Sequence, residues 1–192
     1  MNSIFWLVPI SSILALSFAY FFFKQMMKES EGTDTMKKIA KHVREGAMAY
    51  LKQQYRVVTI VFVVITLLFA VMAYVLKIQN PWVPFAFLTG GFFSGLAGFF
   101  GMRTATYASA RAANAAQRSL NDGLKVAFRS GAVMGLVVVG LGLLDISIWF
   151  YALQYIIGAL DSTTNGIIAA DPSMKLIIIT TTTLTFGMGA ST

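Results

Sequence analysis

The sequence predicts an all-α fold, a polytopic transmembrane helix bundle with four complete helices and the start of a fifth. Of its 192 residues, 57% are hydrophobic and only 12% are charged, which is typical of multi-span membrane proteins and unusual for soluble domains. The apolar residues gather into long runs, and most Lys and Arg residues lie in the connections between these runs. This arrangement predicts helices that cross a bilayer, joined by polar loops.

The first two predicted transmembrane helices are residues 4–23 and 45–76. Residues 4–23 form an apolar run long enough to cross a hydrocarbon core of roughly 30 Å, and no basic residue precedes it as in a cleavable signal. The second helix begins before its span, near Met36, as an amphipathic segment with Thr35 or Asp34 as the predicted N-cap. Its apolar face is predicted to comprise Ile39, Val43, Ala47 and Leu51.

The remaining predicted transmembrane helices are residues 82–109, 124–157 and 174–192. Turn-forming residues precede them, at Lys77–Pro81, Arg118–Gly123 and Asp161–Gly166. The last helix has no polar tail or C-cap where the sequence stops. We therefore expect residues 1–192 to be a single membrane domain and the N-terminal part of a longer chain.

The third helix carries a row of small residues that continues past its apolar part. They recur at steps of three and four, which places them on one side of a helix. They are Ser94, Gly98, Gly101, Ala105, Ala108, Ala112 and Ala115. Small residues let neighbouring helices approach closely in lipid, so we interpret this face as a packing seam.

The positions of the basic residues predict the orientation in the membrane. The connections 24–56 and 103–129 hold 8 and 5 of the 15 Lys and Arg residues, whereas the other side holds Lys77 and Lys175. The positive-inside rule then places both basic connections in the cytoplasm and the N-terminus outside the cell membrane. Because topology accounts for the net charge of +7, we expect no nucleic acid partner.

Few residues are candidates for chemistry, and the sequence supports no catalytic, cofactor-binding or metal-binding assignment. It contains no Cys, a single His42 in a basic segment, and no phosphate-binding loop ending in Lys-Ser or Lys-Thr. Asp145 is the one acid within the apolar part of a predicted transmembrane helix, so it is either a functional residue or an acid satisfied by a neighbouring hydroxyl or water. The threonines at 180–183, with Thr185, could line an ion path or bond to their own backbone and aid packing.

Four segments are distinctive in this order. They are Glu45–Tyr55 (EGAMAYLKQQY), Gly101–Ala108 (GMRTATYA) with Arg111, Leu124–Gly135, and Phe186–Ser191. They resemble the second to fifth helices of the membrane-integral inorganic pyrophosphatases, which are pyrophosphate-energised H⁺ or Na⁺ pumps. The resemblance extends over most of the chain.

The resemblance implies a homodimer in the lipid bilayer that couples Mg²⁺-dependent pyrophosphate hydrolysis to export of H⁺ or Na⁺, with K⁺ as a candidate activator. The family's acidic substrate motifs come later than Thr192, so this chain would supply outer-ring helices and be inactive alone. Two other interpretations stay open. The chain could be a segment of a non-enzymatic cation permease or channel, or a membrane scaffold subunit complete at 192 residues.

Overall fold

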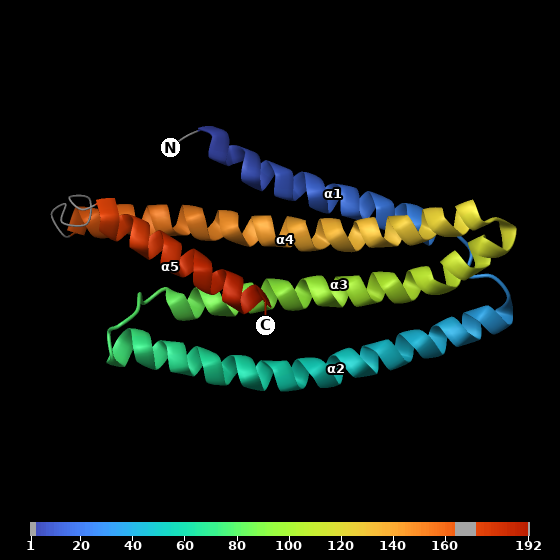
Figure 1. The fold of residues 1–192 in the computed structure, drawn as a ribbon, viewed down its shortest axis with the longest axis horizontal. Helices are drawn as coiled ribbons and strands as arrows, with labels where there is room; N and C mark the ends of the chain where they lie inside the picture. Colours follow the sequence, from blue (N-terminus) through green and yellow to red (C-terminus); the bar gives the residue numbers. More distant parts are fainter. Residues whose placement is uncertain (1–2, 164–171, 192) are drawn as a thin grey trace. The chain divides into compact units, whose positions relative to one another are not determined.

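A computed structural model describes residues 3–163 and 172–191, and every regular element in these ranges is a helix (Figure 1). A 3-10 turn at Ser3–Trp6 leads into α1 (Leu7–Met27), and α2 (Asp34–Ala70) is extended by a π-helical turn at Val71–Val75. The other helices are α3 (Val83–Arg118), α4 (Leu120–Thr163) and α5 (Pro172–Ser191). The first four helices are long and apolar enough to cross a membrane, and the fifth is shorter. The predicted fold class is confirmed.

Two hydroxyl side chains define where helices begin. The Thr33 hydroxyl accepts a hydrogen bond from the Met36 backbone N–H at 3.3 Å, so Thr33 is the N-cap of α2 in place of the predicted Thr35 or Asp34. Ser119 stands alone between α3 and α4, and its hydroxyl accepts a hydrogen bond from the Asp122 N–H at 3.1 Å. Because Ser119 follows the last residue of α3 and also caps α4, the turn between these helices is shorter than the predicted turn at Arg118–Gly123.

At its other end, α4 continues to Thr163, beyond the predicted end near residue 157. The start of the predicted loop Asp161–Gly166 is therefore helical. Residues 164–166 of that loop, and Asp171, lie outside the described residues.

The chain folds as two compact units. Unit 1 comprises residues 1–58 and 95–141, and it contains α1, the first part of α2, the second part of α3 and the first part of α4. Its interior contains two apolar clusters. One comprises Ala19, Ala97, Val133 and Val137, and the other comprises Met26, Ala108, Ala115 and Val126.

Within unit 1, α3 packs through small residues, but on a face rotated from the predicted seam. The buried positions at four- and three-residue spacing are Ala97, Gly101, Thr104, Ala108, Arg111 and Ala115. The predicted Gly98 and Ala105 are exposed. The face therefore includes a threonine and an arginine, which residue size alone did not predict.

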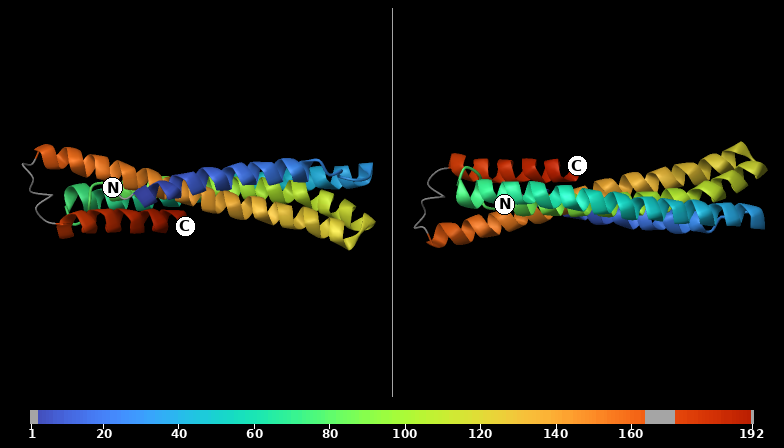
Figure 2. Two further views of the ribbon diagram at one scale, coloured as in Figure 1. Left: turned by 90° about the horizontal axis from the view of Figure 1, so that it is seen from above. Right: turned by 90° about the horizontal axis from the view of Figure 1, so that it is seen from below.

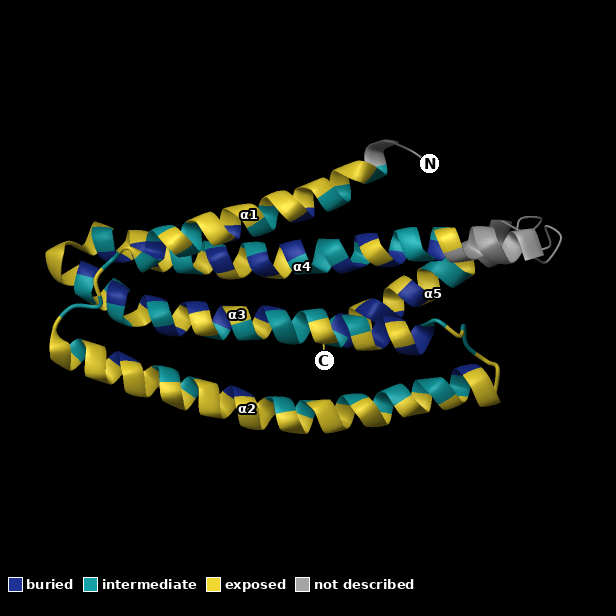
Figure 3. Ribbon diagram, turned by 180° about the vertical axis from the view of Figure 1, so that it is seen from behind, coloured by how far each residue is buried: buried dark blue, intermediate teal, exposed yellow. Residues whose placement is uncertain are grey.

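The inward face of α2 agrees with the prediction at Leu51 and differs from it at Ile39 and Val43. Ala40 and Leu51 are buried, whereas Ile39 and Val43 are exposed, at 59% and 46%. Much of the surface of α2 is exposed along its length (Figure 3). Lipid accepts apolar side chains as readily as a protein core does, so hydrophobicity alone does not identify the inward face of a membrane helix.

Unit 2 comprises residues 59–94 and 142–192, and α5 returns along the first part of α3 (Figure 2). Its core contains Ala86, Trp149, Leu153 and Phe186. The Ser94 hydroxyl donates a hydrogen bond to the backbone oxygen of Ala190 at 2.8 Å, which joins α3 to α5.

Candidate functional site

In unit 1, the connection between α1 and α2 places two glutamates against arginines of α2 and α3. Glu31 accepts hydrogen bonds from both ends of the Arg44 guanidinium, at 2.6 and 3.3 Å, and from Arg111 Nη1 at 2.8 Å. Arg111 Nε also donates to the backbone oxygen of Glu29 at 3.0 Å, and Arg118 donates to the Glu29 carboxylate at 2.7 Å. These interactions attach the loop to two helices.

A tyrosine completes this group. The guanidinium carbons of Arg44, Arg103 and Arg111 lie 4.8, 5.8 and 5.7 Å from the ring centroid of Tyr107, within the range of cation–π attraction. Tyr107 and Arg111 are neighbours because they are one helical turn apart on α3. We refer to Glu29, Glu31, Arg44, Tyr107 and Arg111 as the Glu31 cluster.

The inner part of the Glu31 cluster is shielded from water. The Arg111 and Glu31 side chains are 9% and 15% exposed, whereas those of Arg118 and Glu29 are 57% and 29% exposed. A buried carboxylate needs several donors to offset the loss of hydration, and Glu31 has three. The hydrogen bond from Arg44, aided by the positive charge of Arg111, holds the pKa of Glu31 below its ordinary value of 4.5.

This lowered pKa predicts a loss of stability in acid. The ionised Glu31 stabilises the fold fully above pH 4.5, and this contribution is lost as the pH falls through the lower pKa of the folded state. We expect wild type and Glu31→Gln to differ in Tm at neutral pH and to converge as the pH falls below 4.5 and through the lower pKa of the folded state. Thermal unfolding in detergent across this range provides the measurement. A difference that stays constant in acid would show that Glu31 does not titrate as described.

The chemistry of the Glu31 cluster is suited to structure and not to metal binding. Both of its carboxylates are engaged by arginines. Over residues 3–163 and 172–191, no group of three or more His, Asp or Glu side chains could hold a metal ion. The Mg²⁺ implied by the resemblance therefore does not fit these residues, and no catalytic step is assigned to them.

Asp145 lies in unit 2 and is 1% exposed. Thr89 of α3 lies beside its carboxyl group, and the Thr89 hydroxyl donates a hydrogen bond to the backbone oxygen of Ala86 at 3.1 Å and accepts one from Trp149 Nε1 at 2.7 Å. The Asp145 oxygen Oδ2 has no hydrogen-bond partner within the described part of the chain. A hydroxyl thus lies beside this acid, as one of the two interpretations expects, but its proton is donated to Ala86. The unpartnered oxygen keeps the functional interpretation open.

The threonine run of α5 bonds mainly to its own helix. The hydroxyls of Thr181, Thr182, Thr183 and Thr185 each donate to the backbone oxygen four residues earlier, at 2.8 Å. Thr182 also accepts a hydrogen bond from Asn80 at 3.3 Å in unit 2. These contacts favour the packing interpretation over an ion path.

Sequence reasoning did not find the Glu31 cluster. Glu31 and Arg111 are 80 residues apart, and nothing in the sequence indicates that they pair. The available local signal is the spacing of Tyr107 and Arg111, because four-residue spacing places an aromatic ring beside a cation on a helix. Such spacings are common, so this signal by itself would not have indicated a site.

Comparison with known proteins supplies the family. Residues 13–192 match the family described as inorganic H⁺ pyrophosphatase. The whole chain is 67% identical to 25% of a protein of Bacteroides thetaiotaomicron named "Putative K(+)-stimulated pyrophosphate-energized sodium pump". The chain is also similar to the "K(+)-insensitive pyrophosphate-energized proton pump" of Methanosarcina mazei, with 40% identity. That alignment covers 77% of this chain and 21% of the relative.

The chain thus spans about a quarter of the length of the curated relatives it matches. The four segments singled out in the sequence all lie within the matched residues, and the resemblance drawn from them is confirmed. The long apolar helices agree with a multi-pass membrane protein. This chain belongs to the inorganic H⁺ pyrophosphatase family of membrane proteins.

Proposed function

We propose that this chain is the N-terminal part of a membrane pyrophosphatase that couples Mg²⁺-dependent pyrophosphate hydrolysis to cation export. The observation that carries the proposal is the family match over residues 13–192, supported by 67% identity to a relative named as a pyrophosphate-energised pump. In this proposal, residues 1–192 form one membrane domain that supplies outer-ring helices. They are inactive alone, because the metal-binding carboxylates lie elsewhere in the complete protein.

The names of the relatives favour one form of this proposal. In it, the pump exports Na⁺ and is stimulated by K⁺. The 67% identical relative is named as a K⁺-stimulated sodium pump, whereas the 40% identical one is named as a K⁺-insensitive proton pump. H⁺ export without K⁺ dependence is the alternative within the same family.

The proposed protein is a homodimer in the cell membrane with its N-terminus outside. The concentration of 8 and 5 basic residues in the connections 24–56 and 103–129 supports this orientation. Residues 1–192 contain no Cys, so an introduced cysteine is the single thiol in this part of the chain, and labelling of the parent protein gives the background. An impermeant maleimide on intact cells should label Ile78→Cys and spare Ser30→Cys. The reverse pattern would contradict the orientation.

The activity is tested with the complete protein reconstituted in proteoliposomes. We expect phosphate release from pyrophosphate that requires Mg²⁺, increases with K⁺ and accompanies Na⁺ uptake, and EDTA should abolish it. Purified residues 1–192 should release no phosphate above background. Cation flux without pyrophosphate hydrolysis would favour a permease or channel, and the absence of both would favour a scaffold.

Asp145 is tested in the same proteoliposomes. Asp145→Asn preserves the shape of the side chain and removes its ionisable oxygen. If Asp145 takes part in transport, ion uptake per pyrophosphate hydrolysed should fall. Ser147→Ala, a neighbouring buried position on α4, is the control. Unchanged uptake and hydrolysis in Asp145→Asn would assign this residue a purely structural role.

A further inference from the structure

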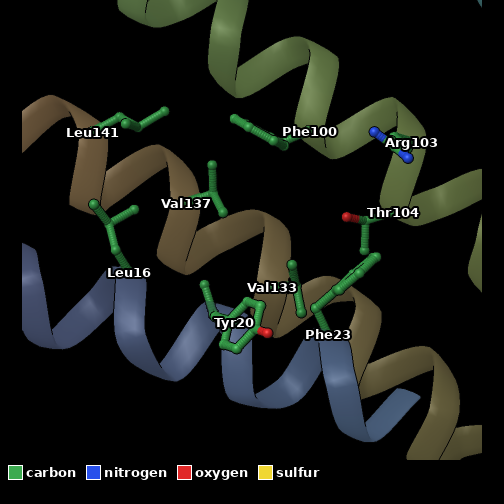
Figure 4. A pocket seen from close by; sticks show the side chains of 10 residues that line it. Leu16, Tyr20, Phe23, Phe100, Arg103, Thr104, Val133, Val137 and Leu141 are labelled. Atoms are coloured by element: carbon green, nitrogen blue, oxygen red, sulfur yellow. The ribbon is translucent and has the colours of Figure 1, made fainter. Parts of the chain in front are cut away.

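Unit 1 contains a cavity of about 420 Å³ between α1, α3 and α4 (Figure 4). Most of its lining is apolar, contributed by Leu16, Ala19, Phe23, Phe100, Val133, Val137 and Leu141. Its polar side chains are Tyr20, Arg103 and Thr104. The volume falls in the range of small-molecule sites, roughly 300–1,000 Å³.

The two ends of the cavity differ in chemistry, and the polar Tyr20 lies among the apolar side chains between them (Figure 4). Leu16 and Leu141 lie at one end, and Arg103 and Thr104 lie at the other (Figure 4). The hydroxyl oxygen of Thr104 points inward, toward Val133 (Figure 4). The cavity is therefore amphipathic, with a long apolar part and a short cationic end.

The positive charge at this end has no ion-pair partner among the described residues. Arg103 is exposed and its guanidinium lies 5.8 Å from the centroid of the Tyr107 ring, but none of the ion pairs in the described chain involves it. In contrast, Arg44 and Arg111 are both paired with Glu31. Lys24 lies one helical turn beyond Tyr20 on α1, is also exposed, and forms none of these ion pairs. Among the described residues, Arg103 in the cavity lining and Lys24, one turn from the lining residue Tyr20, are thus two cations that form no ion pair.

We propose that this cavity binds an anionic phospholipid, with an acyl chain between α1, α3 and α4 and the phosphate at Arg103. Basic pockets between transmembrane helices are suited to anionic lipid headgroups, and the planar guanidinium matches phosphate oxygens. The hydroxyls of Tyr20 and Thr104 are available as further donors, and Lys24 adds attraction to the negative charge. The proposal depends on the membrane location of unit 1 and is independent of pyrophosphate hydrolysis.

The complete protein, purified in detergent, is titrated with dioleoylphosphatidylglycerol and examined by native mass spectrometry. We expect each chain to retain one more molecule of dioleoylphosphatidylglycerol than of dioleoylphosphatidylcholine when the two lipids are supplied at equal concentration. Glycerol phosphate, which has the headgroup charge but no acyl chain, should not compete. Equal retention of both lipids would mean that the charge of Arg103 plays no part, and competition by glycerol phosphate would mean an anion site without a lipid site.

Two variants with matched controls identify the site. Arg103→Gln should weaken binding of the anionic lipid about fivefold, the effect of removing one interfacial positive charge. Arg129→Gln, which removes the same charge outside the cavity, should leave binding unchanged. Val137→Phe should fill the cavity and remove the extra lipid, whereas Val138→Phe, an exposed neighbouring position, should not. Wild-type binding in both Arg103→Gln and Val137→Phe would overturn the proposal. Wild-type Tm values confirm that the variants fold.

Discussion

Arg111→Met is expected to lower the free energy of unfolding by about 3 kcal/mol, because it removes the cation of a buried ion pair and leaves the carboxylate of Glu31 in place. Glu31 would keep Arg44 but lose one of its donors, and the backbone oxygen of Glu29 would lose the Arg111 Nε–H. The methionine keeps the apolar stem, so the loss reports on charge and hydrogen bonds more than on packing. Reversible unfolding of the purified complete protein, in detergent titrated with dodecyl sulfate, gives the free energy directly.

Arg118→Met provides the control for this measurement. Its ion pair with Glu29 is largely exposed, and such pairs contribute from about 0 to 1 kcal/mol. Arg111→Lys should give an intermediate loss, because a single ammonium group cannot replace hydrogen bonds that leave from two different nitrogens of the guanidinium. An equal effect of the Arg111 and Arg118 substitutions would contradict the structural role assigned to the Glu31 cluster.

Gly189→Ala is expected to destabilise unit 2 by about 2 kcal/mol through overpacking between α5 and α3. A Cβ atom at Gly189 would clash with the backbone oxygen of Phe87. The approach is close from both sides, since a Cβ atom at Gly90 would lie 2.5 Å from the backbone oxygen of Phe186. The obstacle is backbone and not a flexible side chain, so the helices must separate. That movement would also strain the hydrogen bond from Ser94 to Ala190.

Gly187→Ala is the matched control, two residues away on the same helix. No atom lies within 4 Å of a Cβ placed there. Alanine is the better helix former by up to about 1 kcal/mol, so this variant should be as stable as wild type or more stable. The unfolding titration described for Arg111 measures both variants. Equal stability of Gly189→Ala and Gly187→Ala would show that α3 and α5 do not approach as closely as described.

The candidate sites show how far local sequence information reaches. Asp145 could be recognised from the sequence, since an acid within an apolar run is costly in lipid whatever the fold. Its neighbour Thr89 could not, because the two are separated by more than fifty residues. The Glu31 cluster is the stronger case. It combines residues from a loop and two helices, and each of its charged members, taken alone, resembles an ordinary surface charge.

The sequence by itself determined the fold class, the long apolar helices and the family. These depend on composition, on runs about 20 residues long and on local motifs, all of which can be read along the chain. Only the tertiary structure decided which faces of α2 and α3 point inward, which charges pair and where the cavity beside Arg103 lies. The physical reason is that lipid and protein interior are almost equally apolar, so the inward face follows from side-chain shape and polar partners, which only the packed helices define.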